Sequence, residues 1–171
     1  MCVGINYVHY YNFLSKLIKV IKSHFLNFKL KFIYNMKRNI FARLYFLKTN
    51  HILCKARING RKANLLIDTG ASNSCIHSEL QDYFELKKDG EPFKASGASE
   101  GKLEAIMTLN CNIKLGKKYN GRQAFALLDL SHVNRVLTDQ GIQKIDGVIG
   151  ADFLKVNKAT IDYVDGKLFL Q

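Results

Sequence analysis

Several features that would assign a protein to a class at once are scarce in this sequence. Its 171 residues contain one proline, Pro92, which excludes a proline-rich linker. The four cysteines, Cys2, Cys54, Cys75 and Cys111, form no CxxC pair and have no metal-ligand spacing with the histidines. We therefore expect no metal and no cofactor. The last three cysteines lie in apolar, strand-like surroundings, so we expect reduced, buried thiols and a cytoplasmic location.

Acidic residues are missing from the first 67 positions, and this absence decides where the positive charge lies. Residues 1–67 hold 13 Lys and Arg and no Asp or Glu, a net charge of +13. Residues 68–171 hold the other 13 basic residues and all 14 acidic ones, a net of −1, which restores the total of +12. A basic extension can attract nucleic acid or an anionic membrane. We expect no nucleic-acid partner for the rest of the chain.

Residues 1–39 form a basic N-terminal extension that is rich in aromatic residues. Its spacing predicts a helix from Tyr10 to Phe25. Lysines recur too often for a membrane-spanning helix, which needs about 20 mostly apolar residues. A secretory signal is also poorly matched. Three interpretations stay open: contact with a membrane surface through residues 1–35, a leader foreign to the native domain because Met36 resembles an ordinary start, or another role.

From residue 40 onward, short apolar segments separated by turn residues predict a mainly β domain that spans residues 40–171. Asn59-Gly60 predicts a tight hairpin turn between strands at 53–58 and 63–67. The expected later hairpins join 107–115 to 123–130 and 160–163 to 167–170. Further strands are expected at 41–47, 75–76, 91–95, 102–106 and 145–149.

Two hydroxyl residues are placed to begin short helices. Ser78 is expected to cap a helix at 79–84, and Ser131 a helix at 133–140. A helical turn is expected after Gly150, with Asp152 capping it or tying it down.

One predicted strand delivers an aspartate into a tight turn, in the run Leu65-Leu66-Ile67-Asp68-Thr69-Gly70-Ala71-Ser72. The apolar residues before the aspartate should be buried, and a carboxylate at the edge of a core is costly without partners. The triplet alone could be an ordinary turn, because Asp and Gly are common turn residues. Two later segments favour a functional interpretation: Ser96-Gly97-Ala98-Ser99, between two expected strands, and Val148-Ile149-Gly150.

Together these motifs resemble the single-domain, retropepsin-like branch of the aspartic proteases. The run from Leu66 to Ser72 resembles the active-site loop, and Val148-Ile149-Gly150 resembles the segment that closes it. The resemblance covers about residues 40–171 and has no counterpart for the extension. It implies an acid-protease-type closed β-barrel with two or three short helices, active as a homodimer. Ser96, Gly97, Ala98 and Ser99 would lie in the flap that binds substrate.

The resemblance also implies a role for each residue of the loop. Asp68 would be the catalytic carboxylate, Thr69 would bond to the partner loop and Ser72 would orient the carboxylate. Gly70 permits the tight turn, and Ala71 is the small residue that follows it. In this chemistry two carboxylates share one proton, and together they activate a water molecule and polarise the peptide carbonyl.

The chain contains one Asp-Thr-Gly, because neither Asp146 nor Asp152 is followed by Thr-Gly or Ser-Gly. A symmetric homodimer would supply the second Asp68. The substrate would be a polypeptide bound in extended form between the two subunits. Two alternatives stay open: a catalytically silent, dimeric peptide-binding module of the same fold, and an anion- or membrane-binding protein that acts through residues 1–67.

Overall fold

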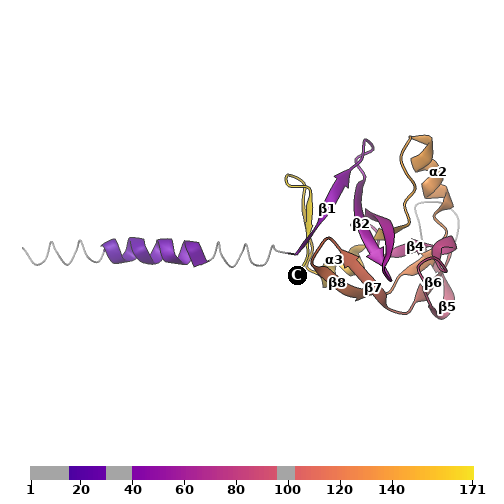
Figure 1. The fold of residues 1–171 in the computed structure, drawn as a ribbon, viewed down its shortest axis with the longest axis horizontal. Helices are drawn as coiled ribbons and strands as arrows, with labels where there is room; N and C mark the ends of the chain where they lie inside the picture. The colour runs from indigo at the N-terminus through magenta and orange to yellow at the C-terminus, as the bar shows by residue number, and fades with distance from the viewer. Residues whose placement is uncertain (1–15, 30–39, 96–102) are drawn as a thin grey trace, which may run out of the picture. The chain divides into compact units, whose positions relative to one another are not determined.

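The computed structural model of the protein describes residues 16–29, 40–95 and 103–171, and the chain divides into two compact units, residues 1–38 and 39–171 (Figure 1). In the first unit, residues 16–29 form a helix. The expected helix began at Tyr10 and ended at Phe25; its first residues lie outside the described ranges, and the observed helix continues four residues further. None of the helices in the described ranges is long and apolar enough to cross a membrane.

The second unit is mainly β, as expected. Its strands are β1 (Phe41–Phe46), β2 (Ile52–Ile58), β3 (Arg61–Ile67), β4 (Cys75–His77), β5 (Lys88–Ala95), β6 (Leu103–Thr108), β7 (Cys111–Leu115), β8 (Tyr119–Gln123), β9 (Ala126–Leu128), β10 (Gly147–Ile149), β11 (Thr160–Asp162) and β12 (Lys167–Phe169). Its helices are the short 3-10 turn η1 (Ser78–Leu80), α2 (Ser131–Asp139) and α3 (Ala151–Val156).

The strands form one sheet in the order β11-β12-β1-β2-β3-β10-β4-β9-β6-β5. The expected closed barrel is wrong, because in the described residues the two end strands of this path, β11 and β5, do not pair with each other. The sheet branches at β2, whose residues 52–54 pair with β1 while residues 56–58 pair with β7. Beyond β2, β7 pairs only with β8 in the described residues. The sheet therefore divides into two arms at β2 and does not close on itself. Figure 1 shows the terminal hairpin in yellow beside β1.

Alternation along β2 explains how the sheet separates two apolar clusters. Ile52, Cys54 and Ile58 belong to the larger cluster, whereas Leu53 points the other way into the smaller one. Successive side chains of a strand point to opposite faces, so one seven-residue strand contributes to both clusters. Beyond Leu53 the second face becomes polar, with exposed Lys55 and Arg57.

Several expected elements differ from the observed ones. The helix expected at 79–84 is only the short 3-10 turn η1. The segment 123–130 was expected as a single arm of a hairpin, but β8 pairs with β7 while β9 pairs with β4 and β6. Neither expected hydroxyl cap is present: η1 follows His77, and α2 follows Leu130. At the start of α2 the Ser131 N–H instead donates to the Asp129 carboxylate at 2.8 Å. Hydrogen bonding to the side chain of Ser131, together with this N–H, lowers the pKa of Asp129.

The described cysteines are free and buried, as the apolar surroundings predicted. Burial raises the pKa of Cys54 to about 12 and the pKa values of Cys75 and Cys111 to about 11. Because the thiolate is the reactive form of cysteine, these three residues behave as small apolar core residues near neutral pH.

Candidate active site

Asp68 lies directly after β3, at the point where two parallel strands end together. β3 pairs in parallel with β10, with Leu66 opposite Val148 and Ile67 opposite Ile149. The Asp68 N–H donates to the Ile149 carbonyl at 3.0 Å, which extends this ladder by one residue. β10 also pairs with β4 on its other edge. The backbone of Asp68 is therefore fixed by a central, buried part of the sheet.

The loop after Asp68 is tightly turned around its own carboxylate. The Gly70 N–H donates to Asp68 Oδ1 at 2.8 Å, and the Ala71 N–H donates to the Asp68 carbonyl at 3.3 Å. The side chain of Asp68 is thus held by a backbone amide two residues ahead. The role expected for the Ser72 hydroxyl stays a prediction.

The segment Val148-Ile149-Gly150 and the start of α3 hold the far side of this loop. The Ala151 N–H donates to the Ala71 carbonyl at 2.8 Å, and the Asp152 N–H donates to the Ser72 carbonyl at 3.2 Å. A Cβ added to Gly150 would lie 2.8 Å from the Ala71 carbonyl oxygen and 2.7 Å from the carbonyl carbon of Asn73. Real Cβ atoms do not approach backbone this closely, so the loop rests directly on Gly150.

A partly buried polar network ties α3 to Ser74, the residue just before β4. Asp152 Oδ1 accepts hydrogen bonds from the Ser74 N–H at 2.9 Å and from the Ser74 hydroxyl at 2.7 Å. The same hydroxyl accepts the Gly150 N–H at 3.0 Å, and Gln123 Nε2 donates to Asp152 Oδ2 at 2.8 Å. Asp152 therefore ties the helix down, as its position suggested. No local pattern pointed to Ser74 or Gln123, because each is a common residue far from Asp152 along the chain.

Asp68, Thr69 and Gly70 are exposed in a single copy of the chain, although β3 before them is buried. The other two carboxylates near the motifs have partners of their own. Asp152 is bound by Ser74 and Gln123, and Asp146 accepts the Asn64 N–H at 2.7 Å. The backbone of Asp68 is thus held by the sheet, while its side chain is exposed to solvent.

The flap expected between two strands falls partly outside the described residues. β5 and β6 form an antiparallel hairpin in which Lys94 lies opposite Glu104. Ser96, Gly97, Ala98 and Ser99 follow β5 in the sequence and lie outside the described ranges. Their assignment to substrate binding stays a prediction.

Comparison with known proteins gives one family match and several structural likenesses. A model of a family described as aspartyl protease matches residues 54–153. The retroviral protease-like domain of Ddi1 from Leishmania major is 17% identical, with a TM-score of 0.51 over 76% of this chain and 89% of that one. That likeness is one of fold. No curated protein matches the sequence.

Two further solved structures are similar. The EIAV protease complexed with the inhibitor HBY-793 is 21% identical, with a TM-score of 0.47 over 69% of this chain and 97% of that one. A retropepsin-like aspartic protease from Rickettsia conorii is 18% identical, with a TM-score of 0.47 over 77% of this chain and 88% of that one.

Proposed function

Because this chain belongs to the aspartyl protease family and has a retropepsin-like fold, we propose that it is an aspartic endopeptidase whose catalytic group is Asp68. The observation that supports this most directly is the placement of Asp68. Its backbone is bonded to Ile149 and its carboxylate to the Gly70 N–H, while its outer side is exposed. A fixed backbone and an exposed carboxylate suit a residue that must contact both a water molecule and a peptide.

The second carboxylate comes from a second copy of the chain. Peptide hydrolysis of this kind needs one carboxylate to accept a proton from water and a protonated one to polarise the carbonyl. Two carboxylates in contact share a proton because like charges at about 3 Å cannot both ionise. The exposed stretch Asp68-Thr69-Gly70 supplies the surface on which two copies can meet, and the interface is isologous in a two-fold dimer.

The remaining roles follow from this arrangement. Residues 40–171 form the protease domain, Thr69 bonds to the partner loop and Ser72 helps to orient the carboxylate. Ala71 and Gly150 pack the loop, since the Ala71 carbonyl lies against Gly150. The flap at Ser96-Gly97-Ala98-Ser99 covers an extended polypeptide substrate. Free, buried thiols suit a cytoplasmic location.

Replacing the catalytic carboxylate tests the proposal. The variant Asp68→Asn should lose all cleavage of an unstructured protein while keeping its thermal unfolding midpoint. The matched control Asp139→Asn changes an exposed aspartate at the end of α2 and should retain full activity. Undiminished cleavage by Asp68→Asn would overturn the assignment.

A catalytically silent, dimeric peptide-binding module of the same fold is the alternative. It predicts binding of extended peptides with no turnover by the unmodified chain at any pH. The intact Asp68-Thr69-Gly70 loop favours the enzyme, because a binding module has no need of an exposed, fixed carboxylate.

A further inference from the structure

Away from Asp68, the face formed by β3, β2 and β7 carries a groove lined by basic side chains. It has a volume of about 610 Å³. Its lining residues are Lys55, Ala56, Arg57, Lys62, Ala63, Asn64, Lys114, Gly116 and Lys117. We call this surface the basic groove. Every charged residue in this lining is a cation, so the groove suits an anionic ligand.

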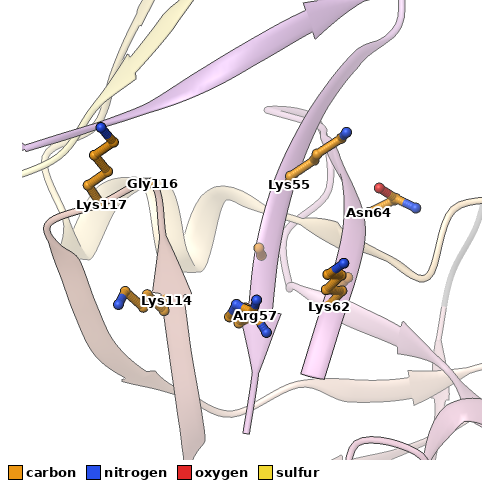
Figure 2. Close-up of a pocket in the computed structure, with 9 residues that line it drawn as sticks. Lys55, Arg57, Lys62, Asn64, Lys114, Gly116 and Lys117 are labelled. Atoms are coloured by element: carbon orange, nitrogen blue, oxygen red, sulfur yellow. The ribbon is translucent and has the colours of Figure 1, made fainter. Parts of the chain in front are cut away.

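The centre of the basic groove is a row of three cations set by strand register. Arg57 on β2 lies directly opposite Lys62 on β3 and directly opposite Lys114 on β7. Figure 2 shows these three side chains at one level on neighbouring strands, with Lys55 and Asn64 at the next level. Neighbouring strands are about 4.8 Å apart, so the three charges are crowded.

The row of Arg57, Lys62 and Lys114 does not stabilise the sheet. Like charges directly opposite each other on neighbouring strands destabilise a sheet. Among the described residues, the ion pairs that involve lysine or arginine are Arg61 with Glu85 and Lys167 with Asp165, and neither includes a cation of the row. Arg57 donates to the Gly60 carbonyl at 2.8 Å, which leaves its other N–H groups available. The charge is thus concentrated and uncompensated on this face.

The lining also indicates which kind of anion fits. Successive nucleotide bases need aromatic side chains to stack on, but the lining residues include no aromatic side chain. Tyr45 lies beneath Lys55, whose Nζ is 5.2 Å from the ring centroid. A membrane surface would need exposed apolar side chains to insert, and the apolar lining is limited to Ala56 and Ala63.

An extended acidic peptide matches the spacing of the cations. Alternate residues of an extended chain lie about 6.6 Å apart, which is also the spacing of Lys55 and Arg57 along β2. Arginine and lysine bind carboxylates through charge-assisted hydrogen bonds. Asn64, in the groove, lies on β3 four residues before Asp68, which directly follows this strand; the separation is about 13 Å at the rise of a β-strand. A substrate that passes Asp68 could therefore reach the groove with a few further residues.

We propose that the basic groove is a docking site for an acidic segment of the polypeptide substrate, outside the catalytic centre. This inference rests on the proposed protease function for the identity of the peptide as substrate. Binding itself requires no catalysis, so the two can fail separately. Docking would raise the affinity for substrates that carry such a segment and leave the chemical step unchanged.

The test uses the full chain with Asp68→Asn, so that no peptide is cut. A fluorescent peptide of alternating Glu and Ser is titrated by anisotropy at about 0.15 M salt, where exposed charges are partly screened. The groove variant adds Arg57→Gln, Lys62→Gln and Lys114→Gln. The control variant adds Lys87→Gln, Lys88→Gln and Lys158→Gln, which removes the same charge from exposed positions outside the groove lining. Both variants keep the basic extension.

We expect the groove variant to bind roughly tenfold more weakly than the control variant, as the loss of three exposed charge pairs implies. A peptide with Gln in place of Glu should bind all three proteins equally weakly. Equal affinity of the groove and control variants for the acidic peptide would overturn the proposal. So would displacement of the peptide from the groove by single-stranded RNA or phosphatidylserine vesicles at lower concentrations than by unlabelled peptide.

Thermal unfolding separates a docking role from a structural one. Removing the crowded row should leave the unfolding midpoint unchanged or raise it, and a lower midpoint would count against the proposal. A second variant, Lys55→Gln with Lys117→Gln, leaves the row intact and should weaken binding by about threefold. With active enzyme, the groove substitutions should raise KM only for substrates with an acidic segment and should not change kcat. Absence of cleavage of every substrate would refute the protease function without affecting the binding result.

Discussion

Asp152 and Ser74 are joined by two hydrogen bonds that end on one carboxylate oxygen, at 2.9 Å from the Ser74 N–H and 2.7 Å from its hydroxyl. Ser74 is completely buried, and its hydroxyl also accepts the Gly150 N–H. Through this single side chain, α3 is linked both to β4 and to the glycine on which the Asp68 loop rests. The network supports the Asp68 loop without contacting the Asp68 carboxylate.

Removing the Ser74 hydroxyl should therefore loosen the loop. In Ser74→Ala the Gly150 N–H loses its buried acceptor, and we expect a loss of about 1–3 kcal/mol in the free energy of unfolding. Urea denaturation would measure this. Ser74→Thr keeps the hydroxyl and should recover most of the stability and the peptidase activity. If Ser74→Ala unfolds at the same urea concentration as the unmodified chain, the hydrogen bonds of the Ser74 hydroxyl do not stabilise the fold.

The variant Gly150→Ala should lower kcat, and this loss should exceed what its lower stability accounts for. The new Cβ would meet the backbone of Ala71 and Asn73 at 2.8 and 2.7 Å, so the loop must move. The control Gly141→Ala has open space around its Cβ but a positive φ of 71°. It should cost about 1 kcal/mol and leave kcat unchanged. Equal kcat values for the two variants would show that the loop does not depend on Gly150.

Mixing subunits tests the shared site. When the unmodified chain is mixed and exchanged with an equal amount of Asp68→Asn, about one quarter of random dimers contain two aspartates. Activity should fall to about half of that of the same amount of unmodified chain alone. Activity unchanged by the added variant would indicate that each chain works independently. The control is a mixture made without time for exchange.

Stability should depend on pH through Asp146. Burial raises the pKa of this carboxyl, against the lowering effect of the Asn64 N–H and of His77. The folded state therefore holds the proton more tightly than the unfolded chain, and ionisation of Asp146 destabilises the fold as the pH rises through the raised pKa. Asp146→Asn should be more stable than the unmodified chain at pH 7, and this advantage should disappear in acid. Chemical denaturation at both pH values would measure it, and an advantage that grows in acid would contradict the sign.

The buried thiols should be unreactive in the folded protein. With pKa values of about 11 to 12, Cys54, Cys75 and Cys111 hold almost no thiolate at pH 8. In a Cys2→Ser variant, a disulfide reagent should modify no thiol within minutes, and three after denaturation. Rapid modification of the folded variant would show that the core opens readily.

Much of the candidate site could be predicted from the sequence because its signals are local. The apolar run before Asp68 identified a buried strand, and Thr69 and Gly70 identified the turn after it. Val148-Ile149-Gly150 was recognisable for the same reason, and the structure places it in parallel register with β3. Strand periodicity likewise located most of the β elements, since alternation and turn residues act over a few positions.

The sequence by itself determined the mainly β character, the aspartate directly after a buried strand and the charge asymmetry between the extension and the remaining chain. Only the tertiary structure decided which distant residues meet. It brought Ser74, Gln123 and Asp152 into one network, aligned Lys62, Arg57 and Lys114 in one row, and opened the sheet at β2. The physical reason is that these relationships depend on the pairing of segments far apart in the chain, and no local preference encodes that pairing.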